Sequence, residues 1–278
     1  MPLAINTNLA AFDAQRHFAS AVSMVQRSFQ RLSSGYRIND AADDAAGLAV
    51  SENLSAQIRA FGVAERNTGT AGSMSQTAES GLGQIGDILI RMREIGVQAA
   101  NGDLTSTSRS HLDTEFQFLK EEIERLAQAT QFNGKDILGG LETTFDFQVG
   151  IGSTSSDVIS VSFGGISLSN FGLSMANVAG TDRMAATGAI DQIDLAFATL
   201  NARRAAFGAA QNRLTVSATN TGTVRTNLSA TNSRIRDLDF ADESAQLARG
   251  QLLMQAGTSI LAQANTQPQL ALSLLSGR

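Results

Sequence analysis

Apolar residues recur every seven positions over most of this chain. Near the N-terminus they advance in alternating steps of four and three, the a/d spacing of a coiled-coil helix. This first seam consists of Phe18, Val22, Val25, Phe29 and Leu32. It stops at Ser33-Ser34-Gly35, and glycine just after the last periodic residue commonly ends a helix. The pattern predicts a helix ending near Ser34 with one narrow apolar face.

Two further helical patterns follow. The second begins within 40–46 and runs with a softer seam to about Ala100, where Asn101-Gly102-Asp103 breaks it. The third returns to the four-three spacing and ends before Asn133-Gly134. Its seam is Leu112, Phe116, Leu119, Ile123 and Leu126. Because a turn separates the two patterns, we expect the third helix to fold back on the second.

The middle of the chain changes period. Apolar and polar residues alternate on both sides of a turn at 153–157, which predicts a β-hairpin at about 143–164 with one buried face. The alternating apolar residues are Phe145, Phe147, Val149, Ile151, Ile159, Val161 and Phe163. From about 165 to 187 the chain has its weakest pattern and is predicted to be a tip or linker.

The last third carries the longest repeat. Seven positions stand seven apart: Ile193, Leu200, Phe207, Leu214, Thr221, Leu228 and Ile235. The run predicts a helix of roughly 60 Å at 1.5 Å per residue. Past 237–242 comes a second ladder, formed by Phe240, Leu247, Met254 and Leu261. Its companions Gly250, Gly257 and Ala264 are small, which would let another helix approach closely.

Composition removes several classes of protein. The chain has no cysteine, which excludes disulfides, thiol nucleophiles and zinc–thiolate sites. Its two histidines, His17 and His111, form no metal motif, so we expect no catalytic site, cofactor or metal. A net charge of −5 argues against a nucleic-acid partner, and no apolar run is long enough for a membrane span. Residues 1–20 lack the pattern of a cleavable secretory signal.

These patterns predict a mainly α fold, an elongated antiparallel helical bundle or coiled coil built by the N- and C-terminal segments around a small β-hairpin region. We expect a terminal coiled-coil domain of 1–43 with 240–278, and a helical core domain of 44–185 with 186–239. A helix with a single seam is marginal alone, so the terminal segments should need partner chains. We therefore assign subunit packing to Phe18, Val22, Val25, Phe29, Leu32, Leu247, Gly250, Met254, Gly257 and Leu261.

Several long blocks of sequence carry a resemblance to a known family. They are 4–8 (AINTN), 31–39 (RLSSGYRIN), 43–51 (DDAAGLAVS), 131–134 (QFNG), 227–237 (NLSATNSRIRD) and 263–265 (QAN). In these blocks, and over roughly 1–140 and 185–278, the chain resembles bacterial flagellin. The resemblance implies a secreted, non-enzymatic homopolymer of the extracellular flagellar filament, served by an export chaperone and a filament cap. The short middle implies that a large outer variable domain is missing.

Two other functions remain open from the sequence. A hook–filament junction protein shares the terminal helices but caps the filament. A soluble coiled-coil adaptor, or an adhesin carried on a filament, would be neither a filament subunit nor a junction protein. The resemblance also implies recognition by the flagellin-sensing Toll-like receptor of vertebrates, through Arg91 and Ile95 on the second helix and Glu115 on the third. Alternatively, these charges form an ordinary solvated face or pack on adjacent subunits.

Overall fold

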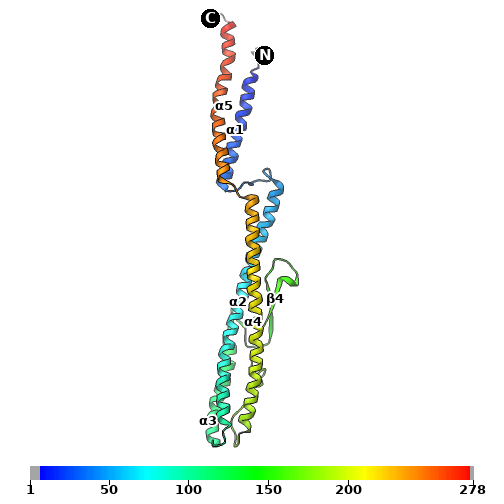
Figure 1. Ribbon diagram of the computed structural model, residues 1–278, viewed down its shortest axis with the longest axis vertical. Coiled ribbons are helices and arrows are strands. Elements are labelled where there is room, and N and C mark those ends of the chain that lie inside the picture. Colours follow the sequence, from blue (N-terminus) through cyan, green and yellow to red (C-terminus); the bar gives the residue numbers. More distant parts are fainter. Residues whose placement is uncertain (1–6, 276–278) are drawn as a thin grey trace. The chain divides into compact units, whose positions relative to one another are not determined.

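The computed structural model describes the backbone of residues 7–275 and the side chains of 7–266 (Figure 1). The start of the block at 4–8 and the end of the predicted terminal domain, 276–278, lie outside the described residues. The α-helices are α1 (Leu9–Ser34), α2 (Ala45–Ala99), α3 (Ser106–Ala129), α4 (Met184–Arg236) and α5 (Phe240–Leu275). The strands are β1 (Gln131–Phe132), β2 (Lys135–Asp136), β3 (Thr143–Gln148) and β4 (Val158–Phe163). The predicted mainly helical fold with a central hairpin is confirmed.

The helix ends follow the local residue chemistry that the sequence predicts. The Asn8 side chain accepts from the backbone N–H of Ala11 and caps the start of α1. At the other end, Gly35 adopts a φ of 75°, which only glycine takes at little cost, and its N–H returns to the Arg31 carbonyl. Asn133 and Gly134 likewise have positive φ values and turn β1 into β2.

The chain divides into two compact units. Unit 1 joins the stretch up to Ala56 with the stretch from Asn227 onward, and unit 2 comprises Gln57–Thr226. The long helices α2 and α4 contribute residues to both units. Each unit is described by itself below.

In unit 1 the two terminal helices α1 and α5 lie side by side (Figure 1). They run antiparallel, since Asn8 donates to the Ala264 carbonyl at 2.7 Å while Ser28 meets Glu243. The segments that follow α1 and precede α5 are joined by backbone hydrogen bonds. Leu238 donates to Gly35 at 3.0 Å, and Arg37 donates to Arg236 at 2.7 Å.

A buried polar cluster closes this end of unit 1. Glu243, only 4% exposed, accepts from the Ser28 hydroxyl at 2.5 Å and lies 3.7 Å from the Arg31 guanidinium. Arg31 also pairs with Asp43 at 3.1 Å. The Asp43 carboxylate accepts from the backbone N–H of Asn39 as well, and this bond is the main reason why its pKa is lowered. The cluster therefore joins α1, the segment after it and α5.

Unit 2 has a continuous hydrophobic core formed by the faces that the heptads predicted. Ile193, Leu200, Phe207, Leu214 and Thr221 of α4 are all buried. Opposite them lie Leu82, Ile85, Leu89 and Met92 of α2, with Phe116 and Ile123 of α3. Ion pairs join α2 to α4 along this core, including Glu65–Arg225 at 2.7 Å and Glu79–Arg204 at 2.8 Å. The predicted return of α3 onto α2 is confirmed.

The hairpin packs one face on the same core. Phe145 pairs with Val161 and Phe147 with Ile159, so the alternating residues share one side. Phe163 on this face contacts helix α4, since its ring centroid lies 5.2 Å from that of Phe207. The alternation does not extend as far as predicted: β3 ends at Gln148, and Ile151 is exposed in the turn.

The prediction of a tip or linker at 165–187 is wrong. Five apolar residues of this segment are buried in the core: Ile166, Phe171, Leu173, Ala176 and Val178. Lys120 of α3 donates to the carbonyls of Ser174 and Ala176, and desolvation there lowers its pKa. The segment follows an irregular path, with a positive φ at Gly172, so its buried residues show no period.

Arg109 ties together three elements at one end of unit 2. Its side chain is buried, and it donates to the carbonyls of Ala99, Asn101 and Thr181 at 2.9, 2.9 and 3.2 Å. Two of these carbonyls lie at the C-terminal end of α2, where a positive charge also complements the helix dipole.

We predict that Arg109→Met lowers the free energy of unfolding by about 3 kcal/mol, because it leaves several buried carbonyls without donors. Urea unfolding followed by circular dichroism measures the change. Arg125→Met is the matched control, since Arg125 pairs with Glu122 on the exposed surface of α3 and should contribute little. Equal losses in the two variants would contradict the role of Arg109.

A second prediction concerns pH. The folded pKa of Asp43 lies below its ordinary value of 3.8, so ionised Asp43 stabilises the fold. That contribution is complete above about pH 5 and disappears as the pH falls below about 4 through the lowered pKa. The stability difference between the wild type and Asp43→Asn should therefore shrink in acid. Thermal unfolding between about pH 7 and 3 checks this, and a constant difference would contradict it.

Candidate assembly and receptor surfaces

The predicted seam residues lie mostly between α1 and α5. Val25 and Gly250 are buried, while the half-buried members are Phe18, Val22, Leu32, Leu247, Met254, Gly257 and Leu261. Phe29 differs, because 54% of its surface is exposed. Nine of the ten predicted packing residues are thus at least half-buried in unit 1.

The glycines of α5 mark a very close approach. A Cβ at Gly250 would lie 2.7 Å from Cγ2 of Val25, and one at Gly257 would lie 3.2 Å from Cδ2 of Phe18. The predicted close contact therefore exists, but its partner is α1 of the same chain. The seam contacts seen here lie within one chain, and the packing of these residues on partner chains stays a prediction.

Other apolar residues on the same two helices remain open. The residues at least about half exposed are Leu9, Phe12, Phe29, Phe240, Leu252, Leu253 and Ile260. Except for Phe29 and Phe240, they lie off the a/d positions, so heptad analysis overlooked them. The sequence did contain a signal for them. These two helices carry more large apolar residues than a single seam between two helices needs. Large apolar side chains left exposed on one helix pair are candidates for an interaction site.

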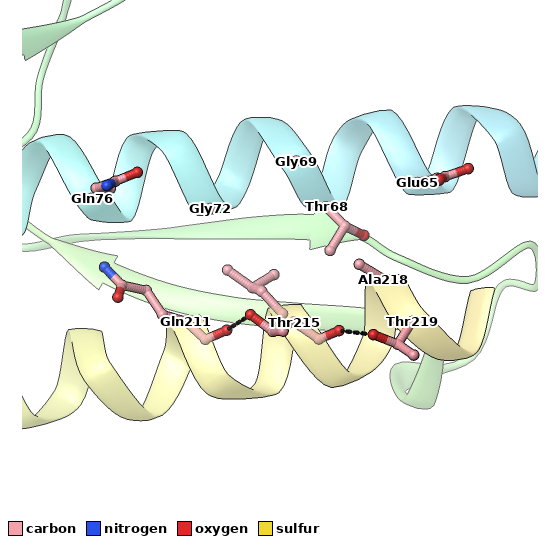
Figure 2. Close-up of a pocket in the computed structure, with 10 residues that line it drawn as sticks. Glu65, Thr68, Gly69, Gly72, Gln76, Gln211, Thr215, Ala218 and Thr219 are labelled. Carbon is pink, nitrogen blue, oxygen red and sulfur yellow. Dashed lines mark hydrogen bonds between the residues drawn. The ribbon is translucent and has the colours of Figure 1, made fainter. Parts of the chain in front are cut away.

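Unit 2 has an open groove of about 560 Å³ between α2 and α4, shown in Figure 2. Thr68, Gly69 and Gly72 line one side, and Gln211, Thr215 and Thr219 line the other. The hydroxyls of Thr215 and Thr219 donate to carbonyls one turn earlier in α4. Glu65, at one end, is paired with Arg225. The hydroxyl of Thr68 likewise donates to the Ala64 carbonyl, so the three threonine hydroxyls and Glu65 are engaged with the protein itself.

The structure brings together two of the three predicted receptor residues. Arg91 donates to Glu115 at 2.7 and 3.0 Å across α2 and α3, and to Glu94 at 3.0 Å. The bonds to Glu115 and then to Glu94 raise the pKa of Arg91. All three side chains are about half exposed, so this ion-pair cluster lies on the surface.

Ile95 does not belong to that surface, and its assignment there is corrected. It is fully buried in the core of unit 2. Residues four apart on a helix, such as Arg91 and Ile95, are neighbours. One of them can still point outward while the other points into the core. The adjacent Gly96 faces α4, where a Cβ would lie 3.0 Å from Cγ1 of Ile190. The face of α2 that carries Ile95 and Gly96 is therefore a packing face.

Within the described residues, no helix is both long and apolar enough to cross a membrane, and no cluster of three possible metal-binding side chains occurs.

Comparisons with known proteins agree with this geometry. The family model for the bacterial flagellin N-terminal helical region matches residues 5–143, and that for the C-terminal helical region matches 190–275. A flagellin of Halalkalibacterium halodurans is 42% identical over 271 residues, covering 98% of this chain and 99% of the relative. The flagellar filament 33 kDa core protein of Treponema phagedenis is 38% identical over 285 residues, covering 98% and 99%.

A solved structure of a putative flagellar hook-associated protein from Vibrio parahaemolyticus covers 70% of this chain and 100% of its own, with a TM-score of 0.60. At 15% identity this likeness concerns the fold alone. The flagellin relatives match over nearly their whole length, and this decides between the alternatives that the sequence left open. The chain belongs to the bacterial flagellin family, whose members are structural, non-enzymatic subunits of the flagellar filament.

Proposed function

We propose that α1 and α5 polymerise this chain with its own copies through the apolar side chains that their mutual contact leaves open. The observation that carries the proposal is the exposure of large apolar residues on both helices, among them Phe12, Phe29 and Ile260. Covering one such side chain contributes about 1.5–3 kcal/mol. The contact between α1 and α5 leaves these side chains exposed, so neighbouring chains would provide this cover.

The contacts between copies should be of the head-to-tail kind. Such contacts join different patches of two identical subunits and generate an open helical polymer when the rotation does not close. In this proposal the terminal domain, 1–43 with 240–278, forms the inner core of the filament. The helical core domain, 44–185 with 186–239, supplies the remaining contacts.

The family likeness also supports the route to the filament. We propose that the chain is secreted through the flagellum with the help of an export chaperone and is added to the growing filament beneath a cap, outside the cell. No large outer domain is needed for this role, because the candidate assembly surfaces lie on the terminal helices.

Phe29→Ser tests the assembly surface. Because Phe29 is 54% exposed, the change should leave thermal unfolding of the monomer nearly unaltered. It should raise the critical concentration for polymerisation by about tenfold or more, since a covered aromatic side chain is replaced by a polar one. Sedimentation and electron microscopy measure the polymer.

Gln26→Ser is the matched control, an exposed polar position on the same helix. It should polymerise like the wild type. If Phe29→Ser also forms normal filaments at the wild-type concentration, the open apolar residues are not the assembly surface.

We also propose a second role, recognition of the monomer by the vertebrate Toll-like receptor that senses flagellin. The observation that favours it is the surface ion-pair cluster of Arg91, Glu94 and Glu115. These side chains come from two helices held on a rigid core, and arginine is frequent among the residues that dominate binding. Ile95 is excluded from this proposal because it is buried.

Arg91→Ala should weaken binding of the monomer to the receptor ectodomain by roughly thirtyfold, the effect of losing a contact worth about 2 kcal/mol. Thermal unfolding should shift little, because the pair is exposed. Arg125→Ala is the control, because it removes an exposed arginine of α3 that lies outside this ion-pair cluster. Unchanged affinity for Arg91→Ala, measured by surface plasmon resonance, would leave Arg91 as an ordinary surface charge.

A further inference from the structure

Two asparagines of this chain, Asn101 and Asn133, are followed directly by glycine. Both are exposed in short turns, the first between α2 and α3 and the second between β1 and β2. In an Asn-Gly pair the backbone nitrogen of the glycine can attack the asparagine side chain, because glycine has no Cβ to hinder the approach. The two turns therefore place the same reactive dipeptide in two different environments.

The main-chain carbonyl of Asn101 accepts a hydrogen bond from a buried guanidinium. Nη2 of Arg109 donates to this carbonyl at 2.9 Å, and Arg109 is only 3% exposed. Within the described residues, the other acceptors of this guanidinium are the carbonyls of Ala99 and Thr181, and none of the three is a carboxylate. An unneutralised positive charge thus lies against the peptide group that joins Asn101 to Gly102.

The attacking nitrogen of Gly102 is accessible. Gly102 is exposed, and a Cβ built on it would meet nothing within 4 Å. In the part of the chain that the structure describes, its N–H donates to no backbone carbonyl. The nitrogen can therefore lose its proton to water and turn towards the Asn101 side chain without breaking a backbone hydrogen bond.

We propose that Asn101 is a site of self-deamidation at which Arg109 is a catalytic residue. When the Gly102 nitrogen loses its proton, the negative charge spreads through the peptide group to the carbonyl oxygen of Asn101. That oxygen already lies 2.9 Å from Nη2 of Arg109, so a hydrogen bond that is in place beforehand stabilises the charge. Arg109 thus favours the form of Gly102 that attacks.

The reaction consumes only water. The Gly102 nitrogen bonds to Cγ of Asn101, and the bond from Cγ to the side-chain nitrogen breaks. Ammonia leaves after taking one proton from the solvent, in place of the proton that Gly102 gave up, and a cyclic imide remains. No atom is oxidised or reduced.

Water then opens the imide ring at either of its two carbonyl carbons. Addition at Cγ yields aspartate. Addition at the main-chain carbonyl carbon breaks its bond to the Gly102 nitrogen and yields isoaspartate. In isoaspartate the new carboxylate stands at the carbonyl that Arg109 holds, so the product gives this buried guanidinium a counter-charge.

Asn133 provides the internal comparison. It has a φ of 52°, Gly134 has a φ of 74°, and the pairing of Phe132 with Lys135 closes their turn. Of the main-chain carbonyls to which the described arginines donate, none belongs to Asn133. The folded structure should therefore slow deamidation at Asn133, because the closed turn hinders the rotation that ring formation needs, but should speed it at Asn101.

The first experiment incubates the full-length chain at neutral pH, folded in buffer and unfolded in urea, and follows both sites by peptide mass spectrometry. Unfolding removes Arg109 from Asn101 and opens the turn at Asn133. Asn101 should react about tenfold faster in the folded chain, less than the roughly hundredfold effect of a donor in an enclosed oxyanion site. Asn133 should react more slowly when folded. A folded rate at Asn101 that is equal to or below the unfolded rate overturns the proposal.

Arg109→Met provides a second test, once circular dichroism has shown that the variant is folded at the temperature of incubation. It should slow deamidation at Asn101 about tenfold and leave the rate at Asn133 unchanged. A purely structural role of Arg109 predicts the opposite, because a loosened turn would react faster. Arg109→Lys keeps a charged donor and should restore part of the rate.

Arg125→Met is the matched control, since it removes an exposed arginine of α3, and it should react like the wild type at both sites. An unchanged or faster rate at Asn101 in folded Arg109→Met overturns the proposal. If that variant does not fold, the comparison of the folded with the unfolded wild type decides. Neither measurement depends on polymerisation, so the result is independent of the proposed function.

Discussion

The close approach of α1 to the glycine backbone of α5 determines which side chains of unit 1 are buried and which stay exposed. Val25 fits against Gly250 and Phe18 against Gly257, leaving no room for a Cβ without displacement. Two contacts at this separation along antiparallel helices define one register, and every other side chain is then directed either inward or outward. Most of the seam that the heptads predict is filled within the chain, while Phe29 and Phe240 stay exposed. Association with copies would therefore depend on residues that remain exposed among the described side chains, such as Phe12, Phe29 and Ile260.

The buried polar cluster at the end of α1 adds specificity to this register. Glu243, Arg31 and Asp43 bind one another or backbone N–H groups only when α1, its following segment and α5 are correctly placed. A shift by one turn would leave Glu243 buried without the Ser28 hydroxyl or the guanidinium, at a cost of several kcal/mol. Packing and polar pairing thus select the same arrangement, although apolar packing alone would tolerate some sliding.

Much of this arrangement could be predicted from the periodicity of the sequence. The predictions that were wrong share one cause, which is that periodicity shows neither irregular backbone nor the width of a buried face. The heptad of α4 and the alternation around Phe163 recur often enough to identify helix, strand and buried face. The segment holding Phe171 and Leu173 is equally buried, but its irregular backbone gives its side chains no period. The assignment of Ile95 to the surface is wrong for a related reason. Spacing shows that Ile95 is a neighbour of Arg91 on α2, but how much of α2 is buried depends on where α3 and α4 pack against it. The pair of Arg91 with Glu115 was predictable because it needs only the return of α3 onto α2.

Glycine within the helices carries information that propensity alone would miss. A helical glycine costs about 1 kcal/mol relative to alanine, and at some positions of this chain close packing accompanies that cost. Gly81 lies against Leu138, Gly96 against Ile190, and Gly250 against Val25, each too close for a Cβ. At these positions packing compensates for the lost helix propensity. Gly250 and Gly257 of α5 are therefore contact sites for α1.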